Sequence, residues 1–193
     1  MRLRALLGGC ALLFAAGASA QDIRPQEQAR LDRFEHWAGV ALLEAFGSGA
    51  AQDVAALTGA LSGVPLVAFD PSLQGEWRCR TIKLGGQPAL TVYSPFRCRM
   101  TLDTTGVTFE KLTGSQRTLG RIEMRDGRAV YLGVGYVADE APQAYGDLAS
   151  DFEGDGRIAP DVAVFERISD TRARLMFPAP VVESDFDILE LTR

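Results

Sequence analysis

The 193-residue sequence is poor in the side chains that most enzymes use for nucleophilic and acid–base catalysis. Its one histidine, His36, stands beside Trp37 in a segment with helical periodicity, where a lone histidine is usually packed or partly exposed. It has no Gly-x-Ser-x-Gly elbow, no Walker loop and no Gly-x-Gly-x-x-Gly turn. These absences favour a protein without catalytic activity. A hydrolase that uses two of the 25 acidic side chains is the less favoured alternative.

Long apolar runs are also missing, because no stretch after residue 20 approaches about 18 uninterrupted apolar residues, so we expect no transmembrane helix. The first 20 residues instead predict a signal peptide, with a basic start, an apolar run over 6–16 and a small-x-small cleavage sequence at 18–20. Cleavage after Ala20 would start the mature protein at Gln21 and place it in the periplasm. A lipoprotein acylated at Cys10 is less favoured, because only about five apolar residues precede that cysteine.

The sequence also lacks an excess of basic residues. Without residues 1–20 the chain has 18 basic and 25 acidic groups, a net charge of −7. This charge argues against nucleic acid as a partner. A chain of this length fits a single exported domain over 21–193, which divides into a helical segment at 25–62 and a β-rich segment at 74–193.

Cysteine is scarce, with Cys79 and Cys98 as the two that follow the predicted signal peptide. In an oxidising compartment an even number of cysteines predicts a disulfide bond. Two buried free thiols are the alternative.

The hydrophobic pattern changes from a helical period to a period of two near Gly75. It predicts helices over 25–46 and about 50–61, with a break at Gly47 and Gly49. The later pattern predicts eight strands, at 75–84, 90–102, 106–112, 117–125, 128–138, 161–168, 172–177 and 186–192. Mostly short turns between them favour an up-and-down antiparallel barrel preceded by two helices.

The expected barrel interior distinguishes a ligand carrier from a structural protein. A hollow barrel needs small or polar inward residues at one end, whereas a filled barrel needs bulky ones. Bulky candidates for inward positions favour a filled barrel, and they are Phe96, Met100, Phe109, Leu119, Leu132 and Phe177.

Gly75-Glu76-Trp77, at the start of the first strand, resembles the Gly-x-Trp signature of lipocalin-type barrels. In that family an arginine near the last strands packs over the tryptophan, so the resemblance implies that Arg172 or Arg174 contacts Trp77. Lipocalins bind small hydrophobic ligands, but the fold alone implies no ligand.

Several longer strings resemble an exported bacterial family known as domain of unknown function 4893. They are 77–86 (WRCRTIKLGG), 96–99 (FRCR), 111–117 (KLTGSQR), 131–133 (YLG) and 165–168 (FERI). The resemblance implies an exported protein of this length, and it implies no activity.

Two loops contain candidate site residues. In the long acidic connection 139–160, Asp151, Glu153 and Asp155 have the alternate spacing of a calcium-binding loop, but position twelve is Val162 instead of glutamate. A solvated acidic loop is the favoured alternative, so we expect no cofactor unless calcium binds here. The turn 114–117 places Ser115, Gln116 and Arg117 either at the rim of a barrel mouth or in an ordinary hairpin.

Four arginines flank the cysteines. If Cys79 faces Cys98 across an antiparallel pair, Arg80 lies opposite Arg97, Arg78 lies opposite Arg99, and all four point away from the disulfide. Like charges in this arrangement need anions. An internal network could supply them from Glu76, Asp103, Glu110 or Glu123.

Anions could also come from outside the chain, as an anionic small molecule, a lipid headgroup or an envelope protein. The sequence therefore predicts a non-enzymatic periplasmic binding module with an arginine-rich outer surface. A structural protein of the cell envelope with a filled barrel is the alternative.

Overall fold

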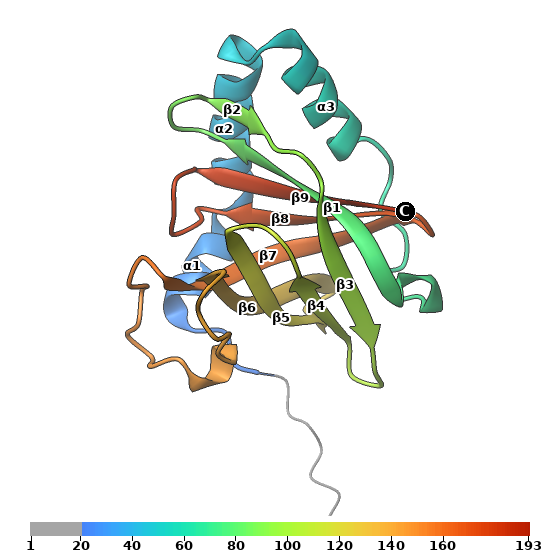
Figure 1. Cartoon of the computed structure of the whole chain (residues 1–193), viewed down its shortest axis with the longest axis vertical. Helices are drawn as coiled ribbons and strands as arrows, with labels where there is room; N and C mark the ends of the chain where they lie inside the picture. The colour runs from blue at the N-terminus through green and yellow to red at the C-terminus, as the bar shows by residue number, and fades with distance from the viewer. Residues whose placement is uncertain (1–20) are drawn as a thin grey trace, which may run out of the picture.

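A computed structural model describes residues 21–193, so the predicted signal peptide and Cys10 lie outside the described residues. Three helices precede nine antiparallel strands (Figure 1). The helices are α1 Pro25–Asp32, α2 Phe34–Ser48 and α3 Ala51–Leu61, with short 3-10 turns η1 Pro71–Leu73 and η2 Tyr145–Asp147. The strands are β1 Gly75–Leu84, β2 Leu90–Val92, β3 Phe96–Leu102, β4 Val107–Lys111, β5 Gln116–Arg125, β6 Arg128–Val137, β7 Ile158–Ser169, β8 Arg172–Pro178 and β9 Phe186–Thr192.

The sheet closes on itself through β1 and β9. The strand order runs from β1 through β3 to β9, and β9 pairs back along β1 from Arg78↔Thr192 to Leu84↔Phe186. This arrangement is an eight-stranded antiparallel barrel, which confirms the predicted fold. Strand β2 pairs only with the last residues of β1, so it extends the sheet beside the barrel. No helix of the described part is long and apolar enough to cross a membrane.

The predicted single strand over 90–102 is wrong, because it consists of β2 and β3 separated at 93–95. Pro95 lies in this break, and proline has no N–H for the β-ladder. The break also moves the chain between two layers. Leu90 packs in the core outside the barrel, whereas Cys98 packs in the core inside it.

The predicted helix over 25–46 is likewise two helices, which meet at Arg33. Leu31, Phe34, Ala41 and Ala45 are buried, and their spacing of three, seven and four residues agrees with the helical period predicted for this segment. Helix α1 packs on β7, α2 crosses β1, β8 and β9, and α3 packs on β2. The three α-helices therefore bury the outer surface of one side of the barrel.

One end of the barrel is filled and closed. Trp77 is 2 % exposed, and its indole N–H donates to the carbonyl of Leu73 in η1 at 2.9 Å. The guanidinium of Arg193 lies 4.0 Å from the centre of the Trp77 ring. The expectation that Arg172 or Arg174 packs there is wrong, because both donate to carbonyls around Gly59–Ser62 outside the barrel. The tryptophan is thus covered by the last residue of the chain.

The filled interior does not extend through the whole barrel. Met100, Phe109 and Phe177 belong to the inner core, as expected, but Leu119 and Leu132 pack in the outer core beside the helices. Their predicted inward orientation is wrong, because Gly120 and Tyr131 next to them take the inward positions of β5 and β6. At the end of the barrel opposite Trp77, the inward residues are polar and charged.

Candidate ligand-binding cavity at the mouth of the barrel

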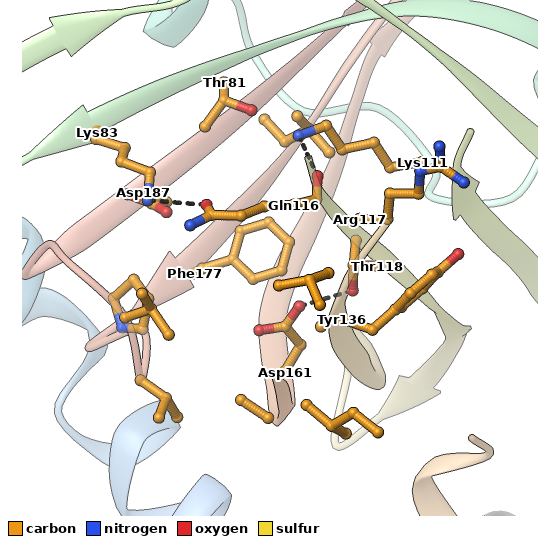
Figure 2. A pocket seen from close by; sticks show the side chains of 18 of the residues that line it. Thr81, Lys83, Lys111, Gln116, Arg117, Thr118, Tyr136, Asp161, Phe177 and Asp187 are labelled. Atoms are coloured by element: carbon orange, nitrogen blue, oxygen red, sulfur yellow. Dashed lines mark hydrogen bonds between the residues drawn. The ribbon is translucent and has the colours of Figure 1, made fainter. Parts of the chain in front are cut away.

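A cavity of about 140 Å³ occupies the end of the barrel opposite Trp77 (Figure 2). It is lined by inward residues near the ends of the strands and by two connections between strands. These connections contribute Gly156 and Arg157, before β7, and the segment 180–182, before β9. The long acidic connection between β6 and β7 therefore reaches this end of the barrel, where it borders the cavity.

Both lysines of the protein, Lys83 and Lys111, line the cavity. They are 9 % and 7 % exposed, and the other 18 basic residues of the chain are arginines. The ammonium of Lys83 donates to Glu183 at 2.9 Å and to the side-chain oxygen of Gln116 at 3.3 Å. The ammonium of Lys111 donates to the backbone carbonyl of Gln116 at 2.8 Å and lies 4.2 Å from the centre of the Phe96 ring.

Two carboxylates, Asp161 and Asp187, line the same cavity. One oxygen of Asp161 accepts a hydrogen bond from the hydroxyl of Thr118 at 2.6 Å, and Thr118 lies 2.7 Å from the hydroxyl of Tyr131. One oxygen of Asp187 accepts from the hydroxyl of Ser184 at 2.6 Å. Within residues 21–193, the second oxygen of each carboxylate has no hydrogen-bond donor, and neither carboxylate has a basic group within 4.0 Å.

Glycines in β6 make room for these groups. A Cβ atom at Gly133 would overlap the hydroxyl of Tyr131, and one at Gly135 would lie 3.0 Å from the carboxylate of Asp161. Because Gly133 lacks a side chain, Tyr131 can lie along the inner wall and reach Thr118, and Gly135 leaves space for the carboxylate of Asp161. The hydrogen bonds therefore run from Tyr131 through Thr118 to the carboxylate that faces the cavity.

The enclosed position of these charged groups changes their pKa values. Desolvation raises the pKa of Asp161, and the Thr118 hydrogen bond opposes this shift. Desolvation raises the pKa of Asp187 from 3.8 to about 6, against the charge of Lys83. Desolvation, together with the charge of Lys83, lowers the pKa of Lys111 from 10.5 to about 8. Each shift disfavours the charged form, as expected where an ionised group has too few compensating partners.

The rest of the lining includes one more polar group, the hydroxyl of Thr81, and the apolar ring of Phe177. The hydroxyl of Thr81 is buried and has no hydrogen-bond partner in the described part of the chain. The ring of Phe177 lies between Gln116 and Asp161, as Figure 2 shows. Apolar walls with a few convergent polar groups are typical of sites for small molecules.

Of the three predicted rim residues in the 114–117 turn, two line the cavity and one does not. Gln116 and Arg117 line the cavity, and Gln116 contacts both lysines. Ser115 does not line it, and its backbone carbonyl accepts from the N–H of Ala138 instead. Arg117 also donates to the carbonyl of Gly114, within its own turn.

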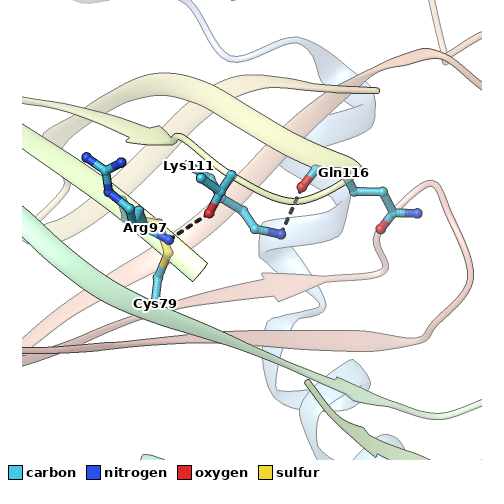
Figure 3. The surroundings of a disulfide bond; sticks show 6 residues. Cys79, Arg97, Lys111 and Gln116 are labelled. Carbon is cyan, nitrogen blue, oxygen red and sulfur yellow. Dashed lines mark hydrogen bonds between the residues drawn. A yellow bond between two sulfur atoms is a disulfide. The ribbon is translucent and has the colours of Figure 1, made fainter. Parts of the chain in front are cut away.

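Cys79 and Cys98 form a disulfide bond in the structure (Figure 3), but the strand register derived from a face-to-face pair is wrong. Cys79 lies opposite Phe96 and Cys98 lies opposite Trp77, so the bond is diagonal across β1 and β3. The two residues still share the inner face, and their Cα atoms are 5.9 Å apart. Alternation alone could not decide between the direct and the diagonal pair, because both put the sulfurs on one face.

The corrected register changes the neighbours of the four arginines. Arg78 lies opposite Arg97, Arg99 lies opposite Glu76 on β1 and Glu110 on β4, and Arg80 lies opposite Glu190 on β9.

Carboxylates of the chain itself pair with three of the four arginines. Glu76 pairs with Arg97 at 3.1 Å and with Arg99 at 3.6 Å, and Glu190 pairs with Arg80 at 2.6 Å. This geometry favours the internal network.

The calcium hypothesis stays a prediction. Asp155 uses one carboxylate oxygen to accept from the backbone N–H groups of Arg157 and Ile158, at 2.8 and 2.7 Å. Asp151 and Glu153 are exposed. Over residues 21–193 no three His, Cys, Asp or Glu side chains are grouped as a metal site requires.

Sequence reasoning missed the charged lining of the cavity, although a signal was present. On four strands a charged residue occupies an inward position near this end of the barrel, and these residues are Lys83, Lys111, Asp161 and Asp187. A charge on the inner face of a strand is unusual in a filled barrel, so it indicates a cavity.

Comparison with known proteins gives one result. A family model described as a domain of unknown function (DUF4893) matches residues 20–191. No curated protein and no solved structure matches the chain.

Proposed function

The chain belongs to the DUF4893 family, and we propose that it is an exported, non-enzymatic protein that binds a small polar molecule in the mouth of its barrel. The observation that carries the proposal is the cavity of about 140 Å³ with Lys83, Lys111, Asp161 and Asp187 on its wall. Charged groups are costly to enclose in a barrel, and apolar residues of similar size would stabilise the fold more. A set of four such groups around one cavity is best explained by a ligand that they bind.

A binding role is favoured over catalysis by the chemistry of the lining. Neither the lone His36 nor a free thiol lies there, since the two cysteines after residue 20 are bonded to each other. Export is supported by the signal-like pattern of residues 1–20 and by the disulfide, which is typical of oxidising compartments. N-terminal sequencing of the protein from a periplasmic fraction tests export, and a start at Gln21 is expected.

The binding proposal is tested by native mass spectrometry of the purified protein, followed by a thermal-shift screen of small polar molecules. A ligand at 100 times its Kd should raise the Tm of a domain of this size by about 5–10 °C. Thr81→Phe would place a ring in the cavity and should abolish the shift. Thr101→Phe, on the exposed outer face of β3, is the matched control and should retain it.

Binding that survives Thr81→Phe would place the site elsewhere. The absence of both a co-purified molecule and a stabilising compound would overturn the proposal.

A second candidate is binding of anionic groups at the exposed arginines of β1 and β3. The observation in its favour is that Arg78 lies directly opposite Arg97 and has no carboxylate within 4.0 Å in the described part of the chain. Like charges in this position destabilise a strand pair. The double variant Arg78→Gln, Arg97→Gln should then lose salt-sensitive binding to anionic lipid vesicles. Unchanged binding, or none by the wild type, removes this candidate.

A further inference from the structure

We infer that the ligand of the barrel-mouth cavity is a small zwitterion, a molecule that carries an ammonium group and a carboxylate group. This inference rests on the proposed binding function and specifies the chemical class of the ligand. It follows from the charges that remain uncompensated in the cavity after the contacts within the chain are accounted for.

The carboxylates supply the site for an ammonium group. Asp161 and Asp187 each have one oxygen that accepts from a neighbouring hydroxyl and one oxygen without a donor among residues 21–193. Lys83 lies nearby, but its ammonium already bonds to Glu183 and Gln116. A primary ammonium is a compact charge with three donors, so it could bond to the free oxygen of either carboxylate.

Lys111 supplies the site for a carboxylate group. Its ammonium has three donors, and one of them bonds to the carbonyl of Gln116. No carboxylate lies within 4.0 Å of it in the described part of the chain, and its other close neighbour is the ring of Phe96. Arg117 lines the same wall and has no carboxylate partner there either. The positive groups without a carboxylate partner therefore lie on β4 and β5, and the carboxylates with a free oxygen lie on β7 and β9.

Ligands with one sign of charge fit this arrangement less well. A simple anion would pair with Lys111 but would face two carboxylates, and a simple cation would pair with the carboxylates but would face Lys111. A neutral ligand would leave all three groups uncompensated, at a cost of several kcal/mol for ions taken out of water. A zwitterion compensates both signs in one binding event.

The cavity also limits the size of the ligand. An engineered cavity of about 150 Å³ in another protein binds benzene, so about 140 Å³ holds on the order of six to ten non-hydrogen atoms. This range includes single amino acids and short ω-amino acids. The ring of Phe177 and the hydroxyl of Thr81 would contact the part of the ligand between its two charges.

The test is a calorimetric titration of the full mature chain with three sets of compounds of matched length. The zwitterions are the L-amino acids, 4-aminobutyrate and 5-aminopentanoate. Butyrate and pentanoate lack the ammonium group, and butylamine and pentylamine lack the carboxylate group. At least one zwitterion should bind about 10-fold or more tightly than either of its singly charged analogues, because each lost charged hydrogen bond costs about 1.5–3 kcal/mol.

Variants assign each charge of the ligand to its site. Lys111→Met should weaken binding of the zwitterion but not of the amine, and Asp161→Asn should weaken binding of the zwitterion but not of the carboxylic acid. Arg99→Met and Asp126→Asn change the same charges at exposed positions away from the cavity and serve as matched controls. Thermal unfolding of each variant verifies that it folds.

If a singly charged analogue binds as tightly as the zwitterion, the inference that the ligand is a zwitterion is overturned, while the binding proposal stays intact. If no zwitterion binds at millimolar concentration, that inference is also overturned. The binding proposal is then decided separately by the wider screen and by native mass spectrometry.

Discussion

Lys83 and Asp187 lie directly opposite each other on β1 and β9, with both side chains inside the barrel, yet they form no ion pair. Lys83 bonds instead to Glu183, in the connection between β8 and β9, at 2.9 Å. Asp187 is left with the hydroxyl of Ser184 as its hydrogen-bond donor within residues 21–193. The charge of Lys83 therefore opposes the rise in the pKa of Asp187 but does not cancel it.

The raised pKa of Asp187 makes stability depend on pH. The folded carboxyl binds its proton more tightly than the unfolded one, so its contribution is complete below pH 3.8 and is lost as the pH rises through about 6. The shift corresponds to at most about 3 kcal/mol. We expect Asp187→Asn to unfold like the wild type at pH 4 and to be more stable by about 1–3 kcal/mol at pH 8. Urea denaturation across this range measures the difference, and a constant difference at all pH values would contradict the assignment.

The diagonal disulfide should contribute substantially to stability. Cys79 and Cys98 are separated by 19 positions, and closing a loop of this length stabilises by about 3 kcal/mol in the chain-entropy model. The variant with both cysteines changed to alanine should lose about 2–5 kcal/mol in urea denaturation. Thiol labelling of the unfolded, unreduced mature protein should detect no free cysteine. Two reactive thiols would show that the bond is absent from the purified protein.

Arg193 should stabilise the closed end of the barrel. Its guanidinium packs on Trp77 and donates to the backbone carbonyls of Ser72, Leu73 and Gln74. Arg193→Ala should lower the free energy of unfolding by about 1–3 kcal/mol and should shift the fluorescence of Trp77. A Trp37→Phe background removes the emission of the other tryptophan. An unchanged spectrum would contradict the contact.

Much of the fold could be predicted because it depends on local patterns. The period of two from Gly75 onward specified the strands, and short turns such as Asp126-Gly127 required antiparallel neighbours. Proline at position 95 is a local cause of the break between β2 and β3. The orientation of Leu119 depends instead on packing between distant segments. Such packing leaves no local signal, because an apolar side chain on a strand can face either the barrel interior or the helices.

The site was harder to predict than the fold. The sequence drew attention to arginines, since four of them flank the cysteines, but the structure pairs three of them with Glu76 and Glu190. The cavity depends on which strand ends meet, and Lys111 and Asp161 are 50 positions apart in the sequence. Their common orientation could be inferred from alternation, but their proximity required the closed barrel.

Two glycines of the β5–β6 pair should respond differently to alanine. A Cβ at Gly120 would overlap the backbone of Leu132 and Gly133, whereas a Cβ at Gly135 would meet the side chain of Asp161 at 3.0 Å. Backbone cannot move aside as a side chain can. We expect Gly120→Ala to lose about 1–3 kcal/mol and Gly135→Ala to lose less than about 1 kcal/mol, measured by thermal unfolding. Equal losses would show that the wall around Asp161 is as rigid as the backbone contact.

The scarcity of lysine makes the cavity accessible to a selective chemical test. In the variant Lys83→Arg, Lys111 is the single lysine of the chain, and arginine keeps the positive charge beside Glu183. An acylating reagent reacts with the neutral amine, whose fraction follows the pKa. Because the pKa of Lys111 is lowered to about 8, its rate of acylation should level off above about pH 8 instead of rising towards 10.5.

Peptide mapping by mass spectrometry separates acylation of Lys111 from acylation of the α-amino group. The matched variant Lys111→Arg leaves Lys83 as the single lysine and shows how the reagent behaves with the amine that bonds to Glu183. A ligand that occupies the cavity should slow acylation of Lys111, and it should not protect the α-amino group. A rate that keeps rising to pH 10 would mean that Lys111 is well solvated, which would contradict its desolvated position in the wall of the cavity.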